Sequence, residues 1–191
     1  MNEQSLIQQA QADIANNGVT SSFSQLVTLY QARLYQYLLA RCHNSHDAED
    51  ILQETFINAY KYLSSYNSQW QFSTWLFTIA NRLIKKQQKL YSQNNEMLSI
   101  DMTTELDTVS IDQSNIWLQI KKMLSATAYD VLWFFYIEEL SIKEIAKILQ
   151  CSQSWVKISL FRSKKKNWLQ VRKLKFCQKI FFWRDKLQYE I

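Results

Sequence analysis

The chain contains no proline and a single glycine, Gly18, in 191 residues. Sheet proteins rely on these two residues at their turns, because glycine adopts positive φ angles and proline presets the first turn position. Helices can be joined by short loops of other polar residues. Hydrophobic residues make up 47% of the chain, which is enough to build cores and argues against general disorder. The composition therefore predicts an all-α protein.

Apolar residues recur three and four positions apart in several stretches, which is the spacing of one helix face. One such stripe begins at Phe23 and continues to Leu38. The stretches AEDILQETFINAYKYL (48–63) and TWLFTIANRLIKKQQKL (74–90) predict two further helices. Ser45 or Asp47 is expected to cap the first of these two, since short polar side chains accept unpaired backbone N–H groups.

Charge is distributed unevenly along the chain. Residues 90–120 contain five acids and no Lys or Arg, whereas residues from 121 onward contain 15 bases and six acids. The acidic stretch is also rich in Ser, Thr and Asn, which favours a linker. We therefore predict two small helical domains joined by an acidic linker. The divisions are a polar N-terminal lead-in (1–21), a first domain (22–90), the acidic linker (91–114), a second domain (115–170) and a basic, aromatic tail (171–191).

The second domain contains a helix-turn-helix pattern. Ser141 and Glu144 have the spacing of a capping box at the start of SIKEIAKILQ. A short turn follows, and in the next stretch Val156 and Leu160 face inward while several cations face outward. Such a second helix is shaped to enter a major groove, with its cations on phosphates. An ordinary helical hairpin with a solvated basic face would show the same spacing.

The first domain contains two further groups of candidate binding residues. Asp50, Gln53 and Glu54 lie three and four positions apart and form an acidic and amide patch on one helix face. This patch is either a plain solvated face or a docking surface for a basic partner. The loop SSYNSQWQFS (64–73) contains three aromatic residues, which either pack as core or stack on unpaired bases.

Four stretches together resemble the extracytoplasmic-function group of bacterial RNA polymerase sigma factors. They are AEDILQETF (48–56), FSTWLFTIA (72–80), EIA (144–146) and WVKISLFR (155–162), in the order and spacing of that family. The resemblance covers roughly residues 22–89 and 115–170. It implies a protein that binds core RNA polymerase, double-stranded promoter DNA and the melted single strand of that DNA. It also implies control by an anti-sigma inhibitor. No cofactor, metal, catalytic residue or small-molecule substrate is expected.

The resemblance also implies a role for each group of residues. Those expected to bind polymerase are Asp50, Gln53 and Glu54. Those expected to bind the minus-ten promoter element are Tyr66, Trp70, Phe72, Asn81, Arg82, Lys85 and Lys86. Those expected to bind the minus-thirty-five element are Lys157, Ser159, Phe161, Arg162 and Lys165. The chain departs from the family pattern at several places: either Asn81 or Arg82 serves the family's Asn position, and Gln150 stands where the turn usually has Gly.

Three other interpretations compete with this one. A helix-turn-helix regulator that binds DNA without polymerase would explain the second domain but not the first. Cys42, His43 and His46 resemble a metal site or a nucleophile pair, yet no further Cys/His pair completes four zinc ligands, so we expect them to end one helix and begin the next. The tail, with Phe181 and Trp183 among lysines, either packs on the second domain or binds a membrane or an inhibitor.

The charge distribution also predicts contact between the two domains in the free protein. The acidic linker and the acid-patched first domain are expected to contact the basic second domain and cover its DNA surface. The three cysteines are far apart and the N-terminus lacks the basic start and apolar core of a signal peptide, so a reducing cytoplasm is the expected compartment.

Overall fold

The computed structural model describes residues 3–16, 21–42, 44–95 and 124–171, with side chains as far as Gln93 in the third range and Ser163 in the last. Every element within these ranges is helical, as the composition predicts. The elements are α1 (Glu3–Ala15), α2 (Ser21–Arg41), α3 (Ser45–Tyr62), the short 3-10 helix η1 (Leu63–Ser65), α4 (Phe72–Asn95), α6 (Ala126–Tyr136), α7 (Ile142–Leu149) and α8 (Gln153–Val171). None of the described helices combines the length and the apolar composition needed to cross a bilayer.

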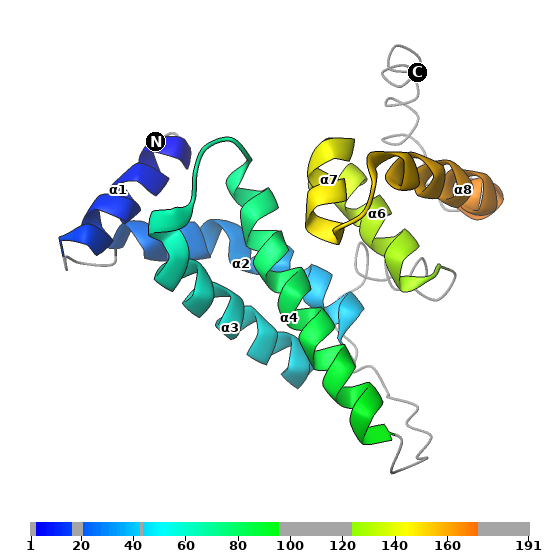
Figure 1. Ribbon diagram of the computed structural model, residues 1–191, viewed down its shortest axis with the longest axis horizontal. Coiled ribbons are helices and arrows are strands. Elements are labelled where there is room, and N and C mark those ends of the chain that lie inside the picture. The colour runs from blue at the N-terminus through cyan, green and yellow to red at the C-terminus, as the bar shows by residue number, and fades with distance from the viewer. Residues whose placement is uncertain (1–2, 17–20, 43, 96–123, 172–191) are drawn as a thin grey trace.

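Helices α1 to α4 pack together at one side of the molecule (Figure 1). The apolar stripe of α2 is buried as predicted, from Phe23 through Tyr30 and Leu34 to Leu38. On α3 the buried residues are Ala48, Ile51, Thr55 and Ala59. On each helix the apolar residues recur every three or four positions, so a single side of the helix is apolar. The apolar sides of α2 and α3 pack against each other.

The predicted polar lead-in is instead largely helix α1. Leu6, Ile7 and Ala10 are buried, and α1 packs against α2 and η1. The side-chain Nε2 of Gln11 donates hydrogen bonds to the carbonyl oxygens of Leu63 at 2.9 Å and Tyr66 at 3.1 Å. Three apolar residues in a Gln-rich stretch give a weak periodic signal, so contacts with distant residues stabilise this helix where local pattern is insufficient.

Helices α6, α7 and α8 form the predicted helix-turn-helix unit. The Ser141–Glu144 capping box is present at the start of α7, as expected. Gln150 ends α7 with φ 58° and ψ 47°, in the left-handed region that favours glycine. Val156 and Leu160 of α8 are buried, as predicted. Ser163 is also buried, because it shares their helix face.

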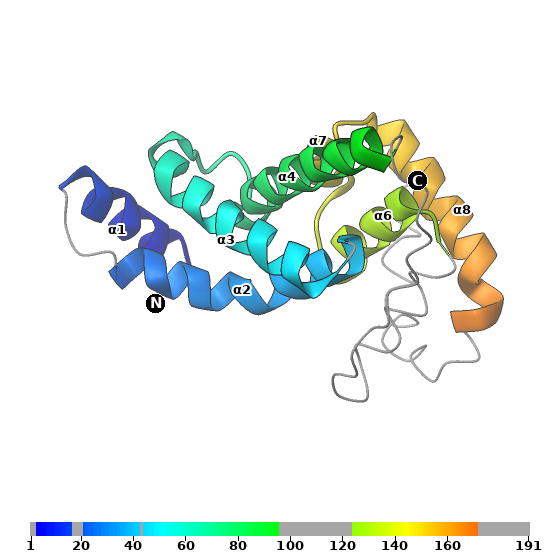
Figure 2. The ribbon, with the colours of Figure 1, turned by 90° about the horizontal axis from the view of Figure 1, so that it is seen from below.

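Helices α1 to α4 form the first unit, and α6 to α8 form the second. The two units contact each other, with α7 beside α4 and α6 beside α2 (Figures 1 and 2). Tyr37 of α2 packs its ring against Phe77 of α4 and against Trp133 and Phe134 of α6, at centroid distances of 5.1 to 6.0 Å. We call this packing of α6 and α7 against α2 and α4 the closed arrangement. Contact between the first and second domains was expected, together with cover of the DNA surface by the acidic linker and the first domain. The contact is present, but Lys157 and Arg162 of α8 remain exposed, and so do Asp50 and Glu54. Residues 96–114 of the acidic linker and 172–191 of the tail lie outside the described residues.

Candidate functional surfaces

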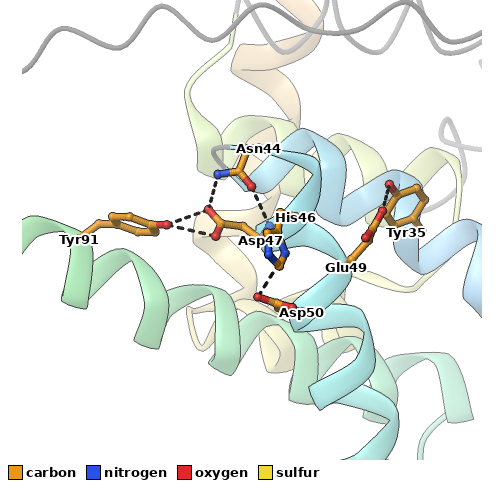
Figure 3. A network of polar contacts seen from close by, with 7 residues as sticks. All are labelled: Tyr35, Asn44, His46, Asp47, Glu49, Asp50 and Tyr91. Carbon is orange, nitrogen blue, oxygen red and sulfur yellow. Dashed lines mark hydrogen bonds and ion pairs between the residues drawn. The ribbon is translucent and has the colours of Figure 1, made fainter.

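Helix α3 presents Asp50, Gln53 and Glu54 together on its solvent face. Their spacing places the three side chains on one side, opposite the buried Ala48, Ile51, Thr55 and Ala59. Figure 3 shows Asp50 beside His46, whose Nδ1 lies 3.5 Å from the Asp50 Oδ2. The side chain of Asp50 is 64% exposed, so its carboxylate is available to a partner.

The start of α3 is held by a network of polar contacts around Asp47 (Figure 3). Asn44 is the N-cap, with extended backbone, and its side chain accepts the Asp47 backbone N–H at 2.7 Å. Neither Ser45 nor Asp47 is therefore the cap, contrary to the prediction. The Tyr91 hydroxyl of α4 contacts both Asp47 carboxylate oxygens, at 3.1 and 3.0 Å. This contact ties α4 to the end of α3 where the acid patch begins.

Ile57 adds an apolar residue to the acid patch, which the sequence pattern did not single out. It lies one turn after Gln53 and Glu54 on the same face, and it is 52% exposed. An exposed large apolar side chain among charged and amide groups has the composition of an interface centre with a polar rim. Its spacing from Asp50 and Glu54 was readable from the sequence, but its exposure depends on where the neighbouring helices pack.

The aromatic loop before α4 is partly packed and partly open. Phe72 is 2% exposed, and its ring lies 5.5 Å from those of Tyr66 and Trp75. The Tyr66 hydroxyl donates to the Trp70 carbonyl at 2.8 Å, and burial raises the pKa of Tyr66 above its ordinary value. Beside this loop is an open hollow of about 380 Å³. Its lining includes Glu3, Tyr30, Tyr66, Trp70, Phe72 and Glu144.

Several residues expected to bind the minus-ten element contact α7 in the closed arrangement. The Asn81 side chain, 2% exposed, donates from Nδ2 to the Ile148 carbonyl at 2.9 Å. The Lys85 ammonium donates to the Leu149 carbonyl at 3.3 Å, so both α4 residues satisfy carbonyls at the C-terminal end of α7. Asn81, which the family resemblance assigns to DNA, is thus covered by α7. Arg82 and Lys86 are exposed.

Glu144 extends this contact to the N-terminal end of α7, and Trp70 lies against two lysines of the same helix. The Lys147 ammonium lies 3.9 Å from the centre of the Trp70 ring, and the Lys143 ammonium lies 5.2 Å from it. The Thr74 hydroxyl donates to Glu144 Oε1 at 3.0 Å, while Ser141 donates to the other carboxylate oxygen. Partial burial alone would raise the pKa of Glu144, but these hydrogen bonds lower it below its ordinary value. The capping-box carboxylate therefore also fastens α7 to α4.

A buried ion pair joins α2 to α6. The Arg41 Nε lies 2.8 Å from Asp130 Oδ1, and the Tyr37 hydroxyl donates to the same oxygen at 2.9 Å. The side chains of Arg41 and Asp130 are 10% and 2% exposed. Burial raises the pKa of Asp130 to about 6, although Arg41 and Tyr37 both act to lower it. A second pair, Arg33–Glu138 at 3.7 Å, lies along the same contact.

Helix α8 carries the residues expected to bind the minus-thirty-five element. Lys157, Phe161 and Arg162 are exposed, and Ser159 is half-buried. The side chain of Lys165 lies outside the described residues. In both views α8 lies at the end of the molecule opposite α1 (Figures 1 and 2). The α3 patch and the α8 face are thus separate surfaces on separate units.

Cys42, His43 and His46 were considered as a metal site or nucleophile pair in the sequence. Cys42 is buried directly after α2, and His46 is exposed in the first turn of α3, while His43 lies outside the described residues. Across the described ranges, no group of three or more His, Cys, Asp or Glu side chains is arranged to hold a metal ion.

Comparison with known proteins gives two family matches. The family model of Sigma-70 region 2 matches residues 26–89, and that of Sigma-70, region 4 matches residues 115–166. The chain is 32% identical over 173 residues to the ECF RNA polymerase sigma factor SigW of Bacillus subtilis (strain 168), which covers 82% of this chain and 92% of SigW. It is 28% identical over 153 residues to the ECF sigma factor SigM of the same strain, covering 76% of this chain and 92% of SigM.

Two solved structures share the fold. One is CnrH in complex with the cytosolic domain of CnrY, with a TM-score of 0.62 and 19% identity over 90% of this chain and 97% of that one. The other is the sigma factor RpoE with the anti-sigma factor NepR from Bartonella quintana, with a TM-score of 0.63 and 21% identity over 75% of this chain and 92% of that one. At these identities the likeness concerns the fold.

Proposed function

Because this chain belongs to the extracytoplasmic-function (ECF) family of RNA polymerase sigma factors, we propose that α3 docks on core polymerase while the loop before α4 and helix α8 bind promoter DNA. Family membership favours transcription initiation over a helix-turn-helix regulator that works without polymerase. The observation that carries the assignment of α3 is its exposed face, where Asp50, Gln53 and Glu54 stand together with no described helix packed over them. We further propose that the protein acts in the cytoplasm as a binding protein and that it catalyses no reaction.

The minus-ten element is assigned to the first unit. Tyr66, Trp70 and Phe72 are among the residues that line the hollow beside α4. A base removed from the stack needs an aromatic-lined pocket and cations for its backbone. Arg82 and Lys86 supply exposed cations on the same helix. In the closed arrangement Asn81, Lys85 and Trp70 are engaged by α7. Promoter melting therefore requires α7 to leave α4, and we propose that core polymerase favours this opened state by binding the two units apart.

An inhibitor is the other partner that we propose. CnrH and RpoE were each solved with a second protein, CnrY and the anti-sigma factor NepR. A protein that binds both units of this chain in the closed arrangement would keep Trp70 and Asn81 away from DNA. Such binding requires no new fold, since the two units already pack together here.

Replacing Ile57 by Ser is expected to weaken polymerase binding by about tenfold. Buried apolar residues at an interface centre contribute roughly 1–2 kcal/mol, and each 1.4 kcal/mol is tenfold in the dissociation constant. Fluorescence anisotropy with labelled protein and core polymerase measures the effect. Leu29→Ser is the matched control, because Leu29 is 55% exposed and belongs to a different helix, α2. Equal losses in the two variants would remove Ile57 from the proposed docking surface.

Replacing Lys157 and Arg162 together by Ala is expected to weaken promoter binding by the holoenzyme and to flatten its salt dependence. The slope of the logarithm of the binding constant against the logarithm of the salt concentration should become less negative. The change should be about 0.9 for each phosphate that the variant no longer neutralises. Binding to core polymerase should stay unchanged, since both residues are on α8. Filter binding across a salt series gives both slopes. A double variant with the wild-type slope would exclude these cations from phosphate binding.

A further inference from the structure

The outward face of α8 carries three large exposed apolar side chains. Trp155, Ile158 and Phe161 are 40%, 50% and 69% exposed, and they follow one another at three-residue intervals. Val156 and Leu160 lie on the opposite side, buried against the rest of the helix-turn-helix unit. Single exposed apolar residues are ordinary on a protein surface, whereas three on one face of a short helical segment indicate a binding surface.

The charges beside this face point to duplex DNA as its occupant. Lys157 and Arg162 are exposed next to the three apolar residues. In helix-turn-helix proteins the N-terminal residues of the second helix contact base edges, and Trp155 and Ile158 lie in the first two turns of α8, which begins at Gln153. The exposed residues placed to read bases therefore include two large apolar side chains, Trp155 and Ile158, beside the polar Gln153 and Ser154. Cations that can reach phosphates stand next to them.

An apolar side chain has one distinctive target on the base edges of the major groove. Thymine presents a C5-methyl group there, whereas the other edge groups are hydrogen-bond donors and acceptors. We propose that Trp155, Ile158 and Phe161 contact thymine methyl groups, so that this sigma factor selects an upstream promoter element rich in thymine on the contacted strands. This inference rests on the proposed function of α8, and it adds the chemical feature that α8 reads.

Deoxyuridine provides a direct test, because it differs from thymidine only by the missing methyl group. The full-length chain bound to core polymerase first selects duplexes from a pool with a randomised upstream segment. The selected duplex is then synthesised with thymidine or with deoxyuridine in that segment alone. Removing each methyl group that α8 touches should weaken holoenzyme binding about fourfold, the effect of one buried methyl-sized group.

Two variants identify the residues responsible. For Ile158→Ser, the difference in affinity between the thymidine and deoxyuridine duplexes should be smaller than it is for the wild type. Lys157→Ala should lose affinity for both duplexes alike and keep the wild-type ratio between them. Both side chains are exposed on α8, so neither substitution opens a cavity in the core.

Each other outcome overturns the inference in a distinguishable way. Equal wild-type binding to both duplexes, with promoter selection intact, would refute methyl recognition and leave the proposed function standing. Failure of the holoenzyme to select any upstream sequence would remove the proposed function of α8, and methyl recognition with it. If Ile158→Ser kept the full methyl preference but lost affinity for core polymerase, the apolar face would belong to a protein interface.

Discussion

Reversing two charges on α3, in the variant Asp50→Lys/Glu54→Lys, is expected to weaken binding to core polymerase at least about 100-fold. Placing like charges across an interface costs several kcal/mol, and roughly 2.7 kcal/mol already corresponds to 100-fold. Both side chains are exposed, so the variant should unfold at nearly the wild-type temperature. Anisotropy titration with core polymerase measures affinity, and transcription from a selected promoter should be lost in parallel.

The control for this variant is a charge reversal away from the patch. Asp13→Lys makes the same change on α1, and it is compared with each single variant, Asp50→Lys and Glu54→Lys. If overall charge governed binding, all three single variants would be equally weakened. Wild-type affinity of the double variant would sink the assignment of α3 as the docking helix, whatever the behaviour of α8 on DNA.

Replacing Arg41 by Met is expected to destabilise the closed arrangement by about 3–5 kcal/mol, because it leaves the buried Asp130 carboxylate without its cation. Arg41 and Asp130 lie on different units, so the substitution should separate the units rather than unfold either one. Spin or fluorescent labels at an exposed site on α3 and at another on α8 report the distance between the units. A population with longer distances is expected in the variant and is absent or small in the wild type.

Replacing both members of the pair distinguishes the ion pair from general packing. Arg41→Met/Asp130→Leu removes both charges and keeps apolar volume, so most of the lost stability should return. If the double variant were as open as Arg41→Met alone, the buried charge would not be the cause. An Arg41→Met protein that remained as closed as the wild type would show that the pair contributes little to holding the units together.

The same pair predicts a pH dependence of the closed arrangement. Burial raises the pKa of Asp130 to about 6, and burial also raises that of Glu138, whereas an opened state returns both toward their ordinary values of 3.8 and 4.5. The closed state therefore binds more protons between pH 4 and 6, and its stability falls as the pH rises through that window. The charged groups facing Asp130 are Arg41 and Lys85, with Tyr37 and Tyr129 beside it. Asp130→Asn should reduce the pH dependence of the label distances.

Local spacing in the sequence was enough to predict most of the helices and to identify the family. The α2 stripe, the Ser141–Glu144 capping box and the inward Val156 and Leu160 were all predicted, and all are present. These features depend on residues within one or two turns of each other, and the helical repeat converts such spacing directly into a face. The family stretches are likewise continuous runs of sequence. The acid patch could be named for the same reason, since its members are within five positions.

The three-dimensional structure alone decided which polar residues are covered. Asn81 was expected to bind the minus-ten element, yet it is buried because α7 packs on α4, and its partner Ile148 is 67 positions away. Tyr37 and Asp130 are 93 positions apart, and neither residue's neighbours indicate its partner. Helix α1 was predicted as a polar lead-in because its local apolar pattern is weak. Its stability comes from packing against α2 and η1, which the local pattern does not reveal. Sequence determined the helices and their faces, since these are local properties, whereas the pairing of faces depends on packing between residues that sequence proximity does not connect.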